Sequence, residues 1–347
     1  MGASHDGGDL PIGLTMGDPA GIGPEIALKA WLARDARSLP PFVVYADAGM
    51  LSARAKAQGL TVPVQIIGAA CETATHFAHL LPVISVPLSA PVVPGRADAI
   101  HAPAILQSIE MAVGAAKGNQ IRAVVTNPIA KFVLYAAGFT HPGHTEYLGA
   151  LANRYWARTD HQPVMMLVSA ALRVVPLTIH VPLKRVPSLV TRRLIIDTVR
   201  TTWAALREDF GIQVPRIAVA GLNPHAGEDG ALGDEDRDTI LPAIRDLQAE
   251  GLNITGPHAA DTLFHEAARQ RYDAAIAMYH DQALIPIKTL SFDTGVNVTL
   301  GLPFVRTSPD HGTAFDIAAE GRASPQSLIE AIKLAGVMAT RRAKQPT

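Results

Sequence analysis

The sequence is poor in cysteine, because Cys71 is the only one among 347 residues. A single thiol cannot form a disulfide within the chain or supply the thiolates of a structural zinc site. No apolar run reaches the roughly 18 residues that a membrane-spanning helix requires. The stretch MGASHDGGDL has no apolar core like that of a signal peptide, and Asp6 stands where a myristoylation signal has Ser or Thr. These absences predict a cytoplasmic protein with no membrane association.

The chain also lacks an excess of charge of either sign. Its 30 Lys and Arg and its 31 Asp and Glu give a formal net charge of −1, and no long basic run occurs. The electrostatic footprint of a nucleic-acid-binding protein is therefore missing. Hydrophobic residues make up 48% of the chain, which is enough for a sizeable core, and the length fits two domains.

Short β-branched runs alternate along the chain with longer segments that have helical spacing. Such alternation is typical of an α/β fold with a mostly parallel sheet. The expected strands are 10–15, 42–46, 62–67, 123–126, 165–169, 174–180, 216–221 and 274–278, and the expected helices include 25–36, 102–116, 188–208 and 235–250.

The glycine-rich stretch GDPAGIGPE (17–25) raises the question of a nucleotide cradle. A dinucleotide-binding fingerprint requires G-x-G-x-x-G, but Gly21 and Gly23 are followed by Ile26 at the third position. Asp47 ends a later strand at about the distance of a ribose-binding carboxylate, which keeps the cradle open as a hypothesis. The alternative, which propensity favours, is a strand-to-helix turn with Pro24 in the first turn of the helix.

Three histidines stand at or just past the ends of expected buried strands, namely His180, His225 and His280. In a parallel sheet these ends share the edge at which ligands bind. Three imidazoles suit zinc, nickel, cobalt or manganese and leave coordination positions open for a substrate. A hydrogen-bonded structural role is the alternative for any one of them.

Further polar groups gather in the loops TNPIAK (126–131) and GHTEY (143–147) and in the segment 295–318. Together with Lys288 and Arg306, their hydroxyl, amide and imidazole groups are typical of a clamp for a phosphate or a carboxylate. A solvated loop surface is the alternative interpretation.

Several blocks resemble, in order, those of the 4-hydroxythreonine-4-phosphate dehydrogenase family of pyridoxal phosphate biosynthesis. The resemblance covers about residues 10 to 340 and rests on GDPAGIGPEI, TNPIAK, GHTEYL, GLNPHAGEDG, ADTLF, YHDQALIPIK and VNVTLGLPFVRTSPDHGTAFDIA. It implies the two-domain fold of isocitrate and isopropylmalate dehydrogenases, with mostly parallel sheets and an active-site cleft between the domains. The expected domains are 1–140 with 298–347, on the cofactor side, and 141–297, for metal, substrate and dimer contacts.

The resemblance also implies roles for single residues. His180, His225 and His280 match metal ligands, and Lys288 and Asp261 are candidates for proton transfer. The positions that match substrate-binding residues are His144, Thr145, Lys288, Asn297 and Arg306. The segment 307–316, here called the late segment, is expected to hold the adenosine half of the cofactor in place of the glycine loop. The residues expected to bind it are Thr307, Asp310, His311, Gly312, Thr313 and Asp316. An acidic residue such as Asp316 favours NAD over NADP.

The implied reaction is the NAD-dependent oxidation of the C3 hydroxyl of 4-phosphooxy-L-threonine, followed by decarboxylation to 3-amino-2-oxopropyl phosphate. The family uses one divalent ion per subunit (Zn, Co, Mg or Mn) and forms a homodimer with its active site at the subunit interface. The alternatives are a related dehydrogenase acting on 4-phospho-threonate or terephthalate dihydrodiol, and a non-enzymatic metal-binding or ligand-sensing protein.

Overall fold

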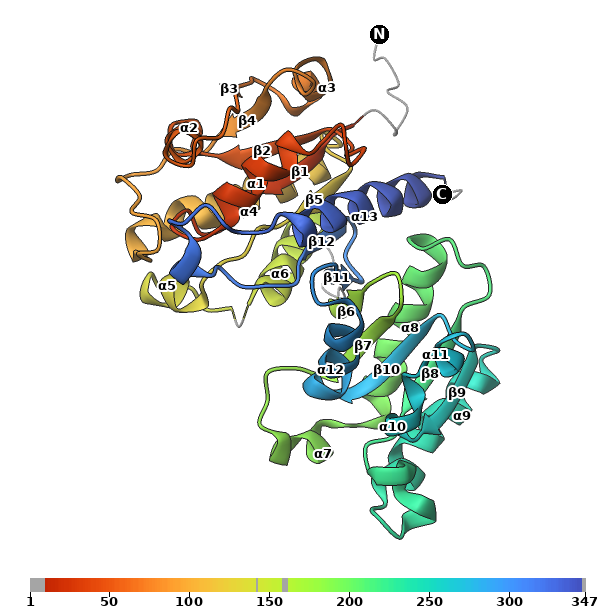
Figure 1. Cartoon of the computed structure of the whole chain (residues 1–347). Coiled ribbons are helices and arrows are strands. Elements are labelled where there is room, and N and C mark those ends of the chain that lie inside the picture. The colour runs from red at the N-terminus through yellow and green to blue at the C-terminus, as the bar shows by residue number, and fades with distance from the viewer. Residues whose placement is uncertain (1–9, 142, 158–161, 345–347) are drawn as a thin grey trace. The chain divides into compact units, whose positions relative to one another are not determined.

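The computed structural model describes residues 10–141, 143–157 and 162–344 (Figure 1). The chain forms two compact units: unit 1 contains residues up to 163 and from 302 onward, and unit 2 contains residues 164–301. The boundaries expected from the sequence lie at 140 and 297. Helix α6 (His144–Trp156) belongs to unit 1, where the Tyr147 hydroxyl donates a hydrogen bond of 2.8 Å to Glu110 of α4 (Ala102–Lys117).

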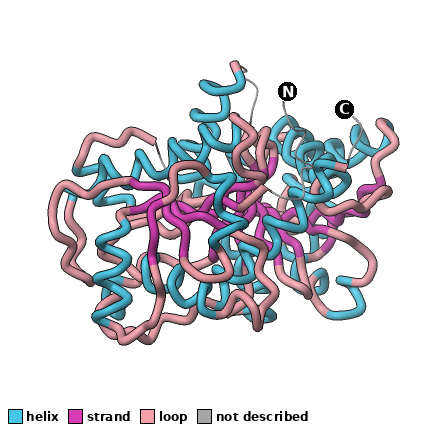
Figure 2. The backbone as a smooth tube through the Cα atoms, turned by 90° about the horizontal axis from the view of Figure 1, so that it is seen from above, coloured by secondary structure: helices cyan, strands magenta, loops and turns pink. Residues whose placement is uncertain are grey.

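Unit 1 is built on parallel strands in the order β3-β4-β2-β1-β5-β12. These strands are β1 (Ile12–Thr15), β2 (Phe42–Ala46), β3 (Val64–Ile66), β4 (Leu81–Ser85), β5 (Ala123–Val125) and β12 (Val305–Pro309). Besides α4 and α6, its helices are α1 (Gly23–Leu32), α2 (Ala48–Ala57), α3 (Thr73–His76), α5 (Lys131–Ala136) and α13 (Gln326–Ala343), with short 3₁₀ turns at Ala70–Glu72, Ala99–His101 and Phe315–Ile317. Helices cover both faces of a parallel sheet, which explains why the central strands are continuous apolar runs (Figure 2).

Unit 2 has strands in the order β11-β6-β7-β10-β8-β9, of which β6 is antiparallel to both neighbours. The strands are β6 (Val164–Val168), β7 (Arg173–Thr178), β8 (Arg216–Ala220), β9 (Asn253–His258), β10 (Ala274–Tyr279) and β11 (Val296–Leu300). The helices are α7 (Val186–Leu189), α8 (Arg192–Glu208), α9 (Leu241–Ala249), α10 (Ala260–Leu263), α11 (Glu266–Arg269) and α12 (His280–Ser291), with helical turns at Leu183–Arg185, Pro224–Gly230 and Asp236–Ile240. Leu167, Val174, Ala218, Ala275 and Ile287 form part of its core.

The α/β class with mostly parallel strands is confirmed, and the differences lie in single elements. Strands β4, β9, β11 and β12 were not expected, because proline or polar residues interrupt their apolar pattern. Helix α8 begins at Arg192 and not at Ser188, since the Thr191 hydroxyl accepts a hydrogen bond from the Leu194 amide and caps the helix there. Within the described ranges, none of the helices has the length and apolarity needed to cross a membrane.

Candidate active site

The glycine loop of unit 1 joins β1 to α1 and packs closely on backbone atoms. A Cβ atom on Gly21 would lie 2.8 Å from the Thr313 carbonyl oxygen, which accepts a hydrogen bond of 3.0 Å from the Ile22 amide. Helix α1 begins at Gly23 and has Pro24 in its first turn. The strand-to-helix turn is therefore confirmed, and Gly21 is required by the close approach of the Thr313 backbone.

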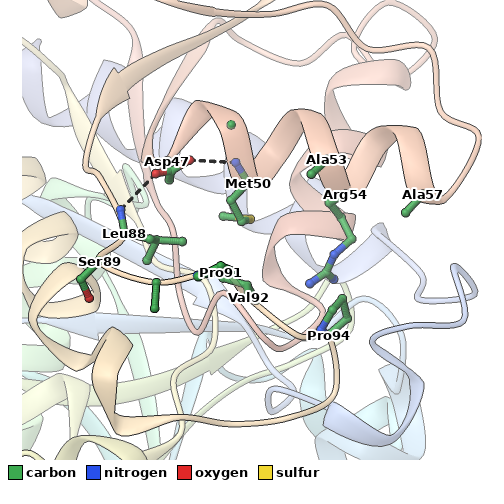
Figure 3. Close-up of a pocket in the computed structure, with 12 residues that line it drawn as sticks. Asp47, Met50, Ala53, Arg54, Ala57, Leu88, Ser89, Pro91, Val92 and Pro94 are labelled. Atoms are coloured by element: carbon green, nitrogen blue, oxygen red, sulfur yellow. Dashed lines mark hydrogen bonds between the residues drawn. The ribbon is translucent and has the colours of Figure 1, made fainter.

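Asp47 caps helix α2 in the same unit. One carboxylate oxygen accepts a hydrogen bond from the Met50 amide (2.8 Å), and the other accepts one from the Leu88 amide (3.0 Å) (Figure 3). The residue lines a cavity of about 610 Å³ between α2 and the segment 88–94. Because backbone groups bind both oxygens, Asp47 acts as a helix cap. These contacts explain the position of Asp47 without a ribose, and the ribose-binding hypothesis stays a prediction.

A buried cation lies between β5 and β12, which are parallel neighbours, with its guanidinium at the carboxyl end of β5. Arg306 of β12 is 2% exposed, and its guanidinium donates to the Thr126 hydroxyl, which follows β5, over 2.6 and 3.2 Å. Burial lowers the pKa of Arg306 to about 9, so that it remains protonated at neutral pH. A guanidinium held in this way suits a bound phosphate or carboxylate.

His144 begins α6 beside this cation. Burial, followed by the charges of Arg306 and Lys131, holds its pKa well below the usual value of 6.5. Its buried Nε2 has no hydrogen-bond partner in the part of the chain that the structure describes. A neutral imidazole with one uncommitted nitrogen can form a directed hydrogen bond to a ligand, and Thr145 follows on the same helical turn.

The late segment of unit 1 divides into buried and exposed residues. Thr307 is fully buried, and its hydroxyl donates to the Ala331 carbonyl (2.8 Å), so that this predicted cofactor contact is committed to packing on α13. The Asp310 amide donates to the Ser327 hydroxyl (3.0 Å). His311, Gly312 and Asp316 are exposed, and Thr313 is half-buried. Within the late segment, the exposed and half-buried side chains are therefore those that follow β12.

The three histidines lie in unit 2 at the edge that the sequence predicts. His180, His225 and His280 follow β7, β8 and β10, and β10 lies between the other two in parallel. The rings of His180 and His280 are 5.7 Å apart and line a pocket of about 230 Å³. Among the described residues of a single chain, no three His, Cys, Asp or Glu side chains form a metal-binding group. The structure therefore brings two of the predicted ligands together.

These two histidines fit a divalent ion in their donor chemistry. The His280 Nδ1 lies 2.7 Å from the Asp281 carboxylate, which is the arrangement that orients metal-binding imidazoles. Imidazole ligands suit zinc or cobalt better than magnesium, which prefers oxygen. His180 and His225 both have positive φ, 53° and 51°, a conformation that non-glycine residues adopt at some energetic cost and that clusters at functional sites.

Two residues that the sequence analysis did not single out hold the loops of His225 and His280. Asp236 accepts hydrogen bonds from the amides of Leu222 and Asn223, at 2.8 and 3.0 Å. Gln282 accepts from the Met278 amide (2.6 Å) and donates to the Gly221 carbonyl (2.8 Å), so that it joins the ends of β10 and β8. Gln282 stands two residues after a predicted ligand, whereas Asp236 is eleven residues from His225 and no sequence feature marks it.

The remaining predicted residues also belong to unit 2. Lys288 lies on α12, two turns after His280, with its ammonium 5.4 Å from the centre of the Phe292 ring. Asp261 is exposed on α10. Asn297 of β11 is half-buried, and its Oδ1 has no hydrogen-bond partner among the residues that are described.

Asp18, in the glycine loop, is a buried carboxyl group that the sequence analysis missed. The residue is 1% exposed; its Oδ1 accepts a hydrogen bond from the Ala20 amide (3.0 Å), and its Oδ2 has no partner among the described residues. Burial raises the pKa of Asp18 from 3.8 to about 6. A carboxyl group directly after a buried strand is the sequence feature that could have indicated it.

We expect Asp18→Asn to stabilise the protein above pH 6. The folded protein binds this proton more tightly than the unfolded chain, so the ionised carboxylate destabilises the fold as pH rises from about 4 to about 6. A neutral amide removes a penalty of about 2–3 kcal/mol at pH 8 and little at pH 4. Urea unfolding at the two pH values measures this difference. An equal loss of stability at both would contradict it.

A buried guanidinium in unit 1 and paired imidazoles beyond the strand ends of unit 2 are typical of ligand-binding α/β proteins. The chain belongs to the family of the pyridoxal phosphate biosynthetic protein PdxA, whose family model matches residues 38–335. It is 56% identical over 341 residues to the 4-hydroxythreonine-4-phosphate dehydrogenase of Methylorubrum populi, covering 98% of this chain and 97% of that protein. The family resemblance inferred from the sequence is thus confirmed.

Solved structures agree with this assignment. The crystal structure of 4-hydroxythreonine-4-phosphate dehydrogenase from Klebsiella pneumoniae superposes with a TM-score of 0.81 at 38% identity, covering 95% of this chain and 99% of that one. A terephthalate 1,2-cis-dihydrodiol dehydrogenase from Burkholderia xenovorans gives a TM-score of 0.62 at 28% identity, with coverage of 94% and 98%. The similarity is therefore higher to the 4-hydroxythreonine-4-phosphate dehydrogenase than to the dihydrodiol dehydrogenase.

Proposed function

We propose that the protein is a 4-hydroxythreonine-4-phosphate dehydrogenase of pyridoxal phosphate biosynthesis. It oxidises the C3 hydroxyl of 4-phosphooxy-L-threonine, and the resulting β-keto acid loses carbon dioxide to give 3-amino-2-oxopropyl phosphate. The observation that carries the proposal is 56% identity to such an enzyme over nearly the whole of both chains. The buried cation of unit 1 supports a substrate with a phosphate group.

The phosphate clamp is assigned to Arg306, His144 and Thr145 of unit 1. Arg306 supplies a fixed positive charge, and neutral His144 and Thr145 supply directed hydrogen bonds. Lys288 and Asn297 of unit 2 are assigned to the same substrate molecule. Lys288 and Asp261 are the candidates for proton transfer at C3 and at the carbon that loses carbon dioxide.

His180, His225 and His280 are assigned to one divalent ion per subunit. When bound, the ion supplies Lewis-acid stabilisation of the negative charge that develops during oxidation and decarboxylation. The side-chain chemistry favours Zn or Co, with Mn and Mg as weaker candidates. We further propose a homodimer with its active site at the subunit interface, in which subunits share the ligands of each ion.

A dehydrogenase of this family uses a nicotinamide cofactor, and we propose NAD in preference to NADP. Asp316 is exposed in the late segment of unit 1, where a carboxylate would accept ribose hydroxyls and repel a 2′-phosphate. We expect kcat/KM to favour NAD by on the order of tenfold, and Asp316→Asn to reduce that ratio. An equal or better value with NADP in the wild type would contradict the assignment.

The product balance tests the proposed reaction. Each NADH formed from 4-phosphooxy-L-threonine should be accompanied by one carbon dioxide and one 3-amino-2-oxopropyl phosphate, measured by absorbance and mass spectrometry. NADH formation without carbon dioxide would contradict the decarboxylation step. A reaction that fails to start with NAD and a divalent ion present would contradict the proposed function.

A further inference from the structure

Among the buried hydrogen-bond acceptors of unit 1 that lack a donor in the described part of the chain, Asp18 Oδ2 and Asn127 Oδ1 lie in neighbouring loops. They follow β1 and β5, which are adjacent parallel strands. Both groups are held by the backbone, because Asp18 Oδ1 accepts from the Ala20 amide (3.0 Å) and Asn127 Nδ2 donates to the Thr15 carbonyl (3.0 Å). Buried acceptors without donors are rare in folded proteins and call for a specific reason.

The loops of Asp18 and Asn127 lie between the late segment, which is assigned to the cofactor, and the segment that holds the Arg306 guanidinium. The Ile22 amide donates to the Thr313 carbonyl (3.0 Å) in the late segment, and the Asp18 amide donates to the Pro128 carbonyl (2.9 Å). Thr126, two residues before Pro128, holds the Arg306 guanidinium. Asp18 therefore occupies a loop between the cofactor segment and the proposed phosphate clamp.

We propose that Asp18 accepts a hydrogen bond from the carboxamide N–H of the bound nicotinamide, with Asn127 as the second acceptor. The inference rests on the proposed function. Hydride transfer requires the nicotinamide ring to lie against the substrate, hence between the adenosine-binding segment and the phosphate clamp. Its carboxamide carries two N–H donors, the number that the two acceptors lack. The bond fixes the rotation of the ring and so selects the face from which hydride is transferred.

Asp18→Asn tests this with the least change in shape. The variant keeps the oxygen that binds the Ala20 amide and places an N–H donor where Oδ2 was, so that a donor faces the donor of the carboxamide. We expect the dissociation constant of NADH to rise by about 10- to 100-fold. The reduced 3-acetylpyridine analogue has a methyl group in place of the amine, and its carbonyl can accept from the new amide. We therefore expect the preference of the wild type for NADH over the analogue to disappear or reverse.

Fluorescence titration of both reduced cofactors, without substrate, measures these constants. Asp47→Asn is the matched control, since backbone amides bind both oxygens of Asp47 and its replacement should leave the preference unchanged. Equal weakening of both cofactors by Asp18→Asn, or no change, would overturn the inference. Weaker binding of 4-phosphooxy-L-threonine with unaltered cofactor constants would assign Asp18 to the substrate ammonium and overturn it too. A wild type that binds no NADH would overturn the proposed function itself.

Discussion

Replacing Arg306 with methionine should lower kcat/KM for 4-phosphooxy-L-threonine by roughly a hundredfold to a thousandfold. Arg306 is almost fully buried, with its guanidinium beside Thr126, and a charge-assisted hydrogen bond to an anion in such a place is worth about 2–5 kcal/mol. Methionine keeps most of the length without the charge or the donors. Steady-state kinetics at saturating NAD gives the effect, and NADH titration should show cofactor binding close to that of the wild type.

Two further variants separate the clamp from general damage to unit 1. Thr145→Val removes one uncharged hydrogen bond with little change in shape, and we expect a loss of about tenfold. Arg37→Met is the matched control, because Arg37 is exposed and its guanidinium donates to the side chain of Gln326. Arg306→Met with kcat/KM within fivefold of the wild type would remove Arg306 from the clamp.

Loss of His280 should produce the second large effect, on metal binding. In His280→Ala, the pair with His180 and the orienting contact to Asp281 both disappear. Removal of an orienting group alone costs roughly 10- to 100-fold in metal affinity, so loss of a ligand should cost at least a hundredfold. We expect almost no zinc or cobalt after dialysis, and turnover that falls with metal occupancy.

The control for this variant is another histidine of unit 2. His265 is exposed and precedes α11, remote in sequence from the strand ends that carry the predicted ligands. His265→Ala should retain the metal content of the wild type, measured by mass spectrometry of the dialysed proteins. Full metal content and activity in His280→Ala would contradict the assignment of a metal to this histidine.

The candidate site could be predicted from sequence where it follows strand ends. His180 and His280 follow apolar strands, so periodicity places them at one edge of a parallel sheet, and the structure confirms their proximity. Arg306 and Thr307 read as loop residues because they are polar, yet both lie in the buried strand β12. Their opposite orientations, toward Thr126 and toward Ala331, depend on strand pairing and cannot be deduced from composition.

Other features depend on contacts between distant segments. Asp18 and Asn127 stand in loops that the sequence singles out, but only packing shows that each buries an oxygen without a described donor. His225 has a positive φ in a loop whose first residues donate hydrogen bonds to Asp236, eleven residues after His225. Sequence patterns record the identity of such groups, whereas burial and hydrogen-bond partners require the three-dimensional structure.

The most direct test of the proposed function compares substrates in one assay. The protein, NAD and a divalent ion are mixed in turn with 4-phosphooxy-L-threonine, 4-phospho-threonate and terephthalate dihydrodiol, and NADH formation is followed by absorbance. We predict that kcat/KM for 4-phosphooxy-L-threonine exceeds the other two values by at least about a hundredfold. No turnover of 4-phosphooxy-L-threonine at any concentration, together with turnover of either other compound, would contradict the account.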